Sequence, residues 1–270
     1  MATSAMRVLR RCILACAIAL SLLPIILLLI WSFLPQKEVL SLDSFNAIIK
    51  GGFTLKNYVA AWTETGFFKR LIASLSMSTG SMLAVVALGV PAAYAAARLQ
   101  RAKAERVGFQ FLSIRALPPI AVSITIYYLF NRSSLAPNWL SLGFLHIAIT
   151  TPVFIWIMIP VFKSVPSELD ELLLIDGFSR LKLLTLVLLP LIFQRMLAVF
   201  LICFVNVWNE TFLSAVFQVN TVTEAIPTLI SHHGYQWGTI MAIGAMVTVP
   251  TLAIIPLIIR LADVPWIRKN

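Results

Sequence analysis

The residues that could do chemistry are few, and they do not gather into a catalytic set. The sequence has no glycine-rich phosphate-binding loop, no G-x-S-x-G turn and no metalloprotease helix. Cys12, Cys16 and Cys203 lie in apolar surroundings without metal-ligand spacing, which predicts buried free thiols. His232 and His233 are adjacent but lack a third ligand, so they do not indicate a metal site. We expect neither catalysis nor a bound metal or other cofactor in this chain.

Residues 164–191 form the one polar stretch with a clear internal design. Pro166 ends the preceding apolar segment, and Ser167 with Asp170 three residues later has the form of a capping box. Leucines then recur at helical spacing. The pattern predicts a short amphipathic helix that begins at this point.

A sharp turn follows this helix. Asp176 and Gly177 form a D-G pair, and glycine accepts the positive φ that other residues resist. Ser179 can cap a second helix, which we expect to run without a break through residues 183–191. The predicted unit is a helix, a turn and a helix fused to an apolar segment.

The composition identifies a membrane protein. Of 270 residues, 60% are hydrophobic and 12% are charged, whereas roughly a quarter of the residues of a soluble domain are charged. A membrane-spanning helix needs about 20 largely apolar residues. Six segments qualify: 12–34, 71–97, 107–130, 140–162, 188–208 and 238–259.

The positive charges predict the orientation. The net charge of +10 is scattered at the ends of apolar segments, so it does not indicate nucleic-acid binding. Lysine and arginine gather before the first segment, between the second and third, between the fourth and fifth, and after the sixth. Cytoplasmic loops retain positive residues. We expect an all-α membrane protein, a single domain over residues 1–270 with six transmembrane helices, cytoplasmic termini and a cytoplasmic loop at 164–187 between helices 4 and 5.

Two arginines interrupt the apolar segments. Arg115 lies one turn before Pro118 and Pro119, which break the helical hydrogen-bond ladder, and Arg195 lies in the fifth segment. An ion-coupled carrier buries ionisable groups in its membrane segments, and neither arginine has an obvious acidic partner. Intrinsic ion coupling is therefore not expected.

Polar residues also mark the outer side of the predicted bundle. Asn206, Asn209 and Glu210 close the fifth segment, and they could hydrogen-bond a polar solute or stabilise neighbouring helices. The sequence leaves these two alternatives open. The outer loop carries FTLKNY at 53–58, followed by aromatic residues, which predicts a short interfacial helix.

The predicted cytoplasmic helix combines acidic and apolar residues. Glu168, Asp170, Glu171 and Asp176 lie beside the apolar run 172–175. Such a run either packs on its own bundle or enters a groove of a partner, and both remain open. The acidic rim favours a docking surface of complementary charge.

These residues resemble the "EAA" loop of ATP-binding-cassette importer permeases. The loop resemblance rests on Val165, Pro166, Glu168, Glu171, Asp176, Gly177, Leu189, Pro190 and Leu191. FTLKNY at 53–58, Arg115 with residues 118–121, WNETF at 208–212 and WGTIMAIGAMVTVPTL at 237–252 are similar to the maltose-type carbohydrate permeases. The resemblance covers nearly the whole chain.

The resemblance implies a non-catalytic permease subunit of a bacterial inner membrane that imports a carbohydrate or related polyol by alternating access. The implied partners are an ATPase dimer that holds ATP and Mg²⁺, a second homologous permease subunit, and a periplasmic or extracellular solute-binding protein. The residues assigned to ATPase coupling are Glu168, Glu171, Leu172, Leu173, Asp176, Gly177, Ser179 and Arg180. The residues assigned to the substrate pathway are Tyr127, Asn131, Asn206, Trp208 and Asn209.

The chain departs from the family pattern at four positions. Leu172 and Leu173 replace two small alanines, Phe178 replaces another, and Gln194 stands where a second proline is common. Bulkier residues on the coupling helix imply a deeper or reshaped groove on the ATPase. A self-contained secondary carrier or channel for a small polar solute remains the alternative function.

Overall fold

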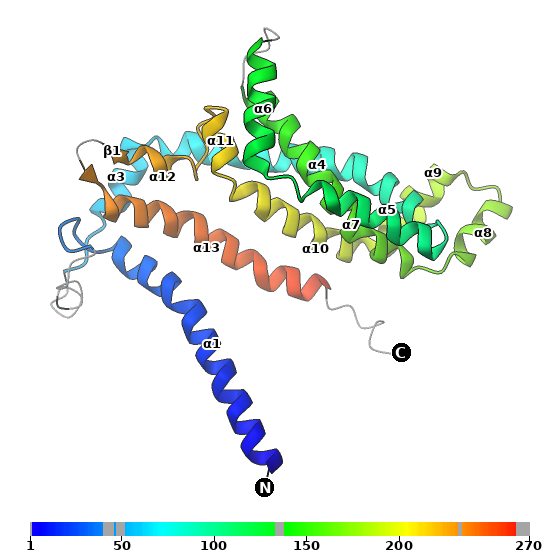
Figure 1. Ribbon diagram of the computed structural model, residues 1–270, viewed down its shortest axis with the longest axis horizontal. Helices are drawn as coiled ribbons and strands as arrows, with labels where there is room; N and C mark the ends of the chain where they lie inside the picture. The colour runs from blue at the N-terminus through cyan, green and yellow to red at the C-terminus, as the bar shows by residue number, and fades with distance from the viewer. Residues whose placement is uncertain (1, 40–45, 47–51, 133–137, 232–233, 263–270) are drawn as a thin grey trace. The chain divides into compact units, whose positions relative to one another are not determined.

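The computed structural model describes residues 2–39, 46, 52–132, 138–231 and 234–262 and is almost entirely helical (Figure 1). The chain divides into two compact units, Met1–Lys69 with Ala225–Val249, and Arg70–Glu224 with Pro250–Asn270. The expected all-α membrane fold is confirmed. The two strands that the described residues contain are two residues long each.

The first unit is built around the end of the N-terminal helix. Its elements are α1 (Ala2–Ser32), α3 (Lys56–Glu64), α12 (Ala225–Thr228), the antiparallel pair β1 (Ile230–Ser231) and β2 (Gly234–Tyr235), and the first part of α13 (Trp237–Ala262). The buried Asn57 amide on α3 donates hydrogen bonds to the carbonyl oxygens of Ser32 (2.9 Å) and Leu34 (2.7 Å). These bonds satisfy carbonyls that the end of α1 leaves without helical partners.

The start of α13 packs against the same amide. A Cβ atom at Gly238 would lie 2.5 Å from the Asn57 Oδ1 atom, a distance that real Cβ atoms do not reach. The Gly238 N–H also donates to Oε1 of Gln36 (2.7 Å). A glycine is therefore needed at position 238. The short helix predicted in this loop is confirmed as α3, which begins within FTLKNY, whereas its interfacial position stays a prediction. Trp62 on α3 contacts the rings of Phe67 and Phe68.

The second unit contains most of the helical bundle. Its elements are α4 (Phe67–Ala97) from Arg70 onward, α5 (Arg101–Ile114), α6 (Pro119–Arg132), α7 (Trp139–Lys163), α8 (Glu168–Ile175), α9 (Arg180–Lys182), the π-helix η1 (Leu183–Leu188), α10 (Leu189–Trp208), α11 (Phe212–Val216) and the rest of α13. Helices α7 and α10 run side by side, with α5 along α7 (Figure 1). Helix α4 packs against them in the core cluster.

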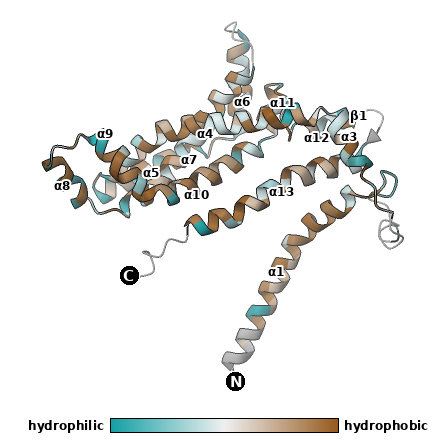
Figure 2. Ribbon diagram, turned by 180° about the vertical axis from the view of Figure 1, so that it is seen from behind, coloured by the Kyte–Doolittle hydropathy of each residue, from teal (hydrophilic) through white to brown (hydrophobic). Residues whose placement is uncertain are grey.

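Five helical segments are long and apolar enough to cross a membrane: Leu9–Ser32, Phe67–Ala97, Trp139–Lys163, Arg180–Trp208 and Trp237–Ala262. Hydrophobic residues dominate all five (Figure 2). A sixth candidate is the pair α5 and α6, which corresponds to the predicted third segment and bends by 69° at its break. The bend lies at Pro118 and Pro119, as the loss of helical hydrogen bonds there predicts.

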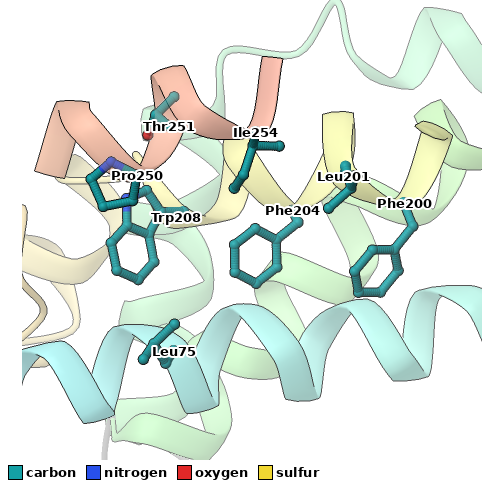
Figure 3. A pocket seen from close by; sticks show the side chains of 8 residues that line it. All are labelled: Leu75, Phe200, Leu201, Phe204, Trp208, Pro250, Thr251 and Ile254. Carbon is teal, nitrogen blue, oxygen red and sulfur yellow. The ribbon is translucent and has the colours of Figure 1, made fainter. Parts of the chain in front are cut away.

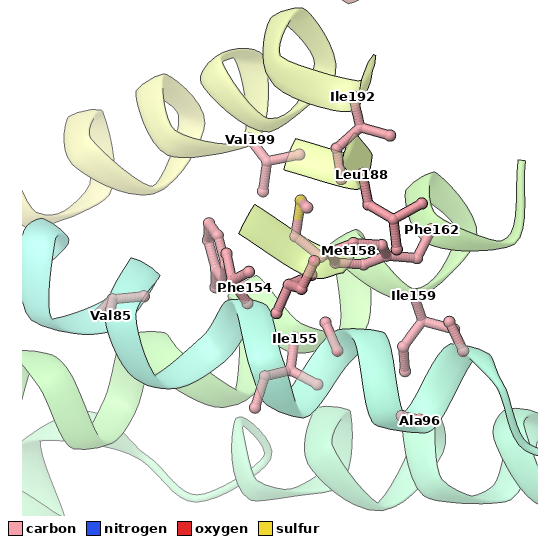
Figure 4. Close-up of a cluster of buried hydrophobic side chains, with 14 of the residues drawn as sticks. Val85, Ala96, Phe154, Ile155, Met158, Ile159, Phe162, Leu188, Ile192 and Val199 are labelled. Carbon is pink, nitrogen blue, oxygen red and sulfur yellow. The ribbon is translucent and has the colours of Figure 1, made fainter. Parts of the chain in front are cut away.

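The core of the second unit joins α4, α7, η1 and α10 (Figure 4). Phe154 and Met158 from α7 and Leu188 from η1 are fully buried in this cluster. Gly89 on α4 faces Phe154, because an added Cβ would lie 2.5 Å from the ring. The expectation of buried thiols is correct for Cys203 but wrong for Cys12 and Cys16. These two cysteines are exposed on α1, because the membrane-spanning part of that helix is not covered by other residues of the chain.

Candidate functional site

The loop at residues 164–187 begins with a helix that starts differently from the prediction. Helix α8 follows Pro166, but Ser167 already has helical backbone angles and its side chain makes no capping hydrogen bond. The predicted capping box is therefore wrong. Its acidic member, Asp170, is buried and turns toward the bundle.

Asp170 is held by the end of α4. The Arg98 guanidinium donates from Nε to Oδ2 (2.6 Å) and from Nη2 to Oδ1 (2.8 Å), and the Tyr94 hydroxyl donates to Oδ2 (2.8 Å). Nη1 of Arg98 reaches the carbonyl oxygens of Phe162 (3.3 Å) and Val165 (3.2 Å). One arginine thus fastens α8 and the end of α7 to α4. Paired, planar donors of this kind give both strength and a fixed orientation.

Helix α8 has an inner and an outer face. Leu169 and Leu173 are half-buried against the main core cluster of the second unit. Leu172 and Ile175 point outward, with 62% and 82% of their surface exposed. The first alternative for the apolar run, packing on the chain's own bundle, holds for this inner face. The outer face is left open, and its entry into a partner's groove stays a prediction.

The acidic residues share the open face. Glu168 and Glu171 are exposed in the first turn of α8, and Asp176 is exposed at its end. They form no ion pair with any residue that the structure describes. Carboxylates in the first turn interact favourably with the helix dipole. The outer face thus offers negative charge around two large apolar side chains.

Gly177 ends α8 in a Schellman motif, with a φ of +85°. The Gly177 N–H donates to the Leu174 carbonyl (3.1 Å), and the Phe178 N–H donates to the Leu173 carbonyl (3.0 Å). The predicted turn at Gly177 is confirmed. Space does not require the glycine, since no atom lies within 4 Å of an added Cβ; the backbone conformation does.

The second helix begins as predicted and then widens. The Ser179 hydroxyl accepts the Lys182 N–H (3.3 Å) and so caps α9. The helix continues through η1, where the Leu189 N–H donates to the Leu184 carbonyl, one residue further back than in an α-helix. Pro190 follows in the first turn of α10. A wider turn accommodates a proline that cannot donate to the ladder, and such π-turns recur at functional sites.

The eight residues assigned to coupling therefore lie on one short segment of chain, from α8 to α9. Five have exposed side chains there in addition to the turn glycine and capping serine, whereas Leu173 packs inward. Their coupling role stays a prediction at this point.

The two arginines that interrupt the apolar segments of the sequence lie in different surroundings. Arg195 donates a hydrogen bond to the Ser164 hydroxyl, and Arg115 is exposed at the α5–α6 bend.

The five residues assigned to the substrate pathway are spread over α6 and α10. Tyr127 on α6 is half-buried, with its ring edge-on to Phe217 at 5.9 Å, and Asn131 is exposed. Trp208 is buried and lines an apolar pocket of about 340 Å³ within the second unit (Figure 3). It stacks on Phe204, their ring centroids 6.2 Å apart. The indole N–H of Trp208 has no hydrogen-bond partner among the described residues.

The outer amides and Glu210 make local bonds. The side-chain N–H groups of Asn206 and Asn209 donate to the carbonyls of Ile202 and Val205, each at 2.9 Å. Both amides are exposed, so their oxygens remain accessible. Glu210 accepts the Leu213 N–H (3.1 Å) at the start of α11. Helix stabilisation accounts for the N–H groups, and the pathway role of the amides remains a prediction.

His232 and His233 lie outside the described residues. Within the described residues, no group of three or more histidine, cysteine, aspartate or glutamate side chains could hold a metal ion.

Sequence reasoning missed Arg98 and Tyr94. Arg98 follows the small-residue run 92–97 and was counted only as a topological charge. Its one signal is a position directly after a membrane segment, where an arginine can bind the ends of neighbouring helices.

Comparison with known proteins identifies the class. The sequence profile of the family described as "Binding-protein-dependent transport system inner membrane component" matches residues 89–264. The chain belongs to this family. It is thus a multi-pass membrane component of a binding-protein-dependent transport system.

Two relatives of this chain are named as permease proteins, and each matches the chain over most of its length. The inner membrane ABC transporter permease protein YcjP of Escherichia coli is 24% identical over 250 residues, 89% of this chain and 88% of the relative. The trehalose/maltose transport system permease protein MalG of Thermococcus litoralis is 26% identical over 239 residues, 85% of this chain and 84% of the relative. The crystal structure of a bacterial ABC transporter involved in the import of the acidic polysaccharide alginate contains a chain with the same fold, with a TM-score of 0.71 and 17% sequence identity. The match covers 96% of this chain and 97% of that chain.

Proposed function

We propose that this chain is a non-catalytic permease subunit of an ABC importer and that it receives mechanical work through the outer face of α8. The observation that carries the proposal is the contrast between the two faces of this helix. Its inner face is fixed to α4 and α7 by Arg98 and Asp170, while its outer face leaves Leu172 and Ile175 exposed among carboxylates. A helix that is attached to the bundle on one side and exposed on the other can transmit a displacement imposed by a partner to the membrane-spanning helices α4 and α7.

The proposed partner on this face is an ATPase dimer, which binds ATP and Mg²⁺ and carries out hydrolysis. A groove that accepts α8 needs apolar walls for Leu172 and positive charge for Glu168 and Glu171. Asp176, Gly177, Ser179 and Arg180 shape the turn that follows. Because Leu172 replaces a small residue usual in the resembling family and points outward, we infer a deeper or reshaped groove on this ATPase.

The proposed cycle is alternating access. ATP-driven closure of the ATPase pair moves α8, and the attached spans rearrange from inward-open to outward-open. A solute-binding protein can favour the outward-open state only by binding it more tightly. We propose a second homologous permease subunit as the other half of the pathway.

The proposed solute is a carbohydrate or related polyol. The name of the Thermococcus litoralis relative, which specifies trehalose and maltose, supports this class, as does the alginate importer with the same fold. We propose Tyr127, Asn131, Asn206, Trp208 and Asn209 as pathway residues in this subunit. We also propose a bacterial inner-membrane location with both termini in the cytoplasm, supported by the distribution of lysine and arginine.

The test is reconstitution in proteoliposomes. The chain is assembled with its ATPase, the second permease subunit and the loaded binding protein, and uptake of labelled oligosaccharide or polyol is measured with and without ATP. We expect uptake only with ATP and all four components. Uptake by this chain alone, or driven by an ion gradient without ATP, would show a self-contained carrier and contradict the proposal.

A further inference from the structure

Two largely buried arginine–carboxylate pairs lie at the two ends of α4. At one end, Arg98 binds Asp170 of α8, and 18% and 8% of these side chains are exposed. At the other end, Arg70 binds Glu224 in the loop after α11, and 14% and 15% are exposed. The two arginines lie about 40 Å apart along the helix, given the α-helical rise per residue. The same kind of contact thus fastens α4 at both ends.

The loop after α11 is attached to α4 by its backbone as well. The Val222 N–H donates to the Ser74 hydroxyl on α4 (2.9 Å), and Nη1 of Arg70 donates to the Thr221 carbonyl (3.3 Å). Residues 221–223 are buried, although they belong to no helix or strand. Loops usually run over the surface of a protein. This loop is instead fixed against α4.

The same loop is bound to the end of α10. The Thr223 hydroxyl donates to the Glu210 carbonyl (3.0 Å), and the Glu210 carboxylate accepts the Leu213 N–H of α11 (3.1 Å). Glu210 directly follows Asn209, a proposed pathway residue. Helices α8 and α11 lie at opposite ends of α10 (Figure 1). A continuous set of contacts therefore joins α8, through α4, to the pathway end of α10.

A contribution to stability does not by itself explain the ion pair at this loop. A buried ion pair is often no more stabilising than well-packed apolar residues, because both charges lose their hydration. A guanidinium adds orientation, since its planar donors fix the carboxylate that they bind. Gln218 in the same loop has a φ of +56°, a conformation that persists only where surrounding contacts hold the backbone. Both features indicate a loop held in one defined position on α4.

We propose that Arg70 and Glu224 are positioning residues of the transport cycle. They transmit the displacement of α8 along α4 to the end of α10, where the pathway residues Asn206 and Asn209 lie. The inference rests on the proposed function, because it needs an ATPase that moves α8. Rigid helices joined by ion pairs and hydrogen bonds can carry such coupling between distant sites. Coupling free energies are reciprocal, so a change at the solute pathway also biases the position of α8.

Hydrogen exchange in the assembled transporter tests this role and needs no solute. Exchange is measured without nucleotide and after trapping with ATP and vanadate. In the wild type, trapping should change the exchange of the α8 amides and of residues 209–216. Arg70→Gln should preserve the change at α8 and abolish most of the change at residues 209–216. Without nucleotide, exchange of residues 219–224 should accelerate about tenfold or more in this variant, because Glu224 loses its largely buried partner.

Two control variants separate coupling from the stability of the loop. Lys69→Gln removes an exposed positive charge directly before Arg70, and it should leave both nucleotide responses unchanged. Ser74→Ala keeps the ion pair and removes only the acceptor of the Val222 N–H. It should accelerate exchange of the loop while the nucleotide response at the end of α10 persists. Loss of that response in Ser74→Ala would show that loop stability, and not the ion pair, carries the effect.

A second variant breaks the pair from the other side. Glu224→Gln removes the charge with almost no change of shape, so it should reproduce the loss at residues 209–216 even where Arg70→Gln does not assemble. A normal nucleotide response at residues 209–216 in these variants, unchanged exchange of the loop, or an equal effect of Lys69→Gln would each overturn the inference. A wild type whose α8 does not respond to ATP and vanadate would instead contradict the proposed function, so the two failures are distinguishable.

Discussion

Replacing Arg98 with alanine should detach α8 from the bundle while leaving the outer face of the helix unchanged. The substitution removes both hydrogen bonds to the Asp170 carboxylate and both bonds to the carbonyls of Phe162 and Val165. Asp170 is only 6% exposed. Its charge would then be held by the Tyr94 hydroxyl alone, or it would have to move into water and take α8 with it.

The expected cost is large for a single residue. Removing one partner of a buried ion pair costs about 3–5 kcal/mol, because the other charge stays buried without compensation. The Arg98 side chain is 18% exposed and water can reach part of it, so we expect on the order of 2–4 kcal/mol for the attachment of α8. About 3 kcal/mol corresponds to a change of more than a hundredfold in the attachment equilibrium.

Two readouts separate detachment from general unfolding. Hydrogen exchange of the α8 amides should accelerate strongly in Arg98→Ala, while exchange in the core of α7 should stay close to that of the wild type. In the assembled transporter, ATP hydrolysis should continue while solute uptake per ATP falls. Arg98→Lys should recover only part of the coupling, because an ammonium group cannot reproduce the paired geometry of the guanidinium.

The matched control is Arg101→Ala. Arg101 lies three residues away and pairs with Glu105 on the surface, with 91% of its side chain exposed. Exposed pairs of this spacing contribute only about 0.3–0.5 kcal/mol. Equal effects of Arg98→Ala and Arg101→Ala on α8 exchange would refute the proposed role of the buried pair.

Three further substitutions have defined outcomes. Gly177→Asp should leave the protein in the membrane but abolish uptake and solute-stimulated ATP hydrolysis, because a non-glycine residue resists the φ of +85° at the end of α8; normal uptake would contradict the coupling assignment. Asn209→Ala should change the solute affinity or selectivity measured in uptake while basal ATP hydrolysis persists, and unchanged transport kinetics would remove this residue from the pathway. Gly238→Ala should lower the thermal unfolding midpoint in detergent, since the new Cβ would displace the Asn57 amide and break two buried hydrogen bonds, about 1–3 kcal/mol in all; an unchanged midpoint would show that α13 shifts at no cost.

Local patterns predicted the parts of the fold that depend on nearby residues. The turn at Gly177 and the cap at Ser179 follow from residues within one or two turns of helix, and both are present. The break at Pro118 and Pro119 was predictable because proline removes helical hydrogen bonds wherever it falls. Its 69° bend was not, because a lost hydrogen bond fixes where the helix breaks but not the angle between the two halves, and α5 lies along α7, which is distant in sequence from the break.

The pairing of Asp170 could not be predicted from its neighbours. The residue fits a local capping box with Ser167, yet its partner Arg98 is 72 positions away in the sequence. A buried carboxylate gains more from a guanidinium fork than from an exposed backbone N–H. The widened turn of η1 was also missed, since its leucine-rich sequence is that of an ordinary helix.

Crosslinking from the outer face of α8 tests the central claim most directly, that this face docks on the ATPase. Leu172→Cys is introduced after replacement of the three natural cysteines, labelled with a maleimide-linked benzophenone and irradiated in the assembled transporter. Leu186→Cys on η1 is the control, because Leu186 is exposed to a similar extent, 65% against 62%. Docking of this face predicts a crosslink to the ATPase from position 172 and none from position 186. No ATPase crosslink from position 172, in a transporter that still hydrolyses ATP and takes up solute, would contradict it.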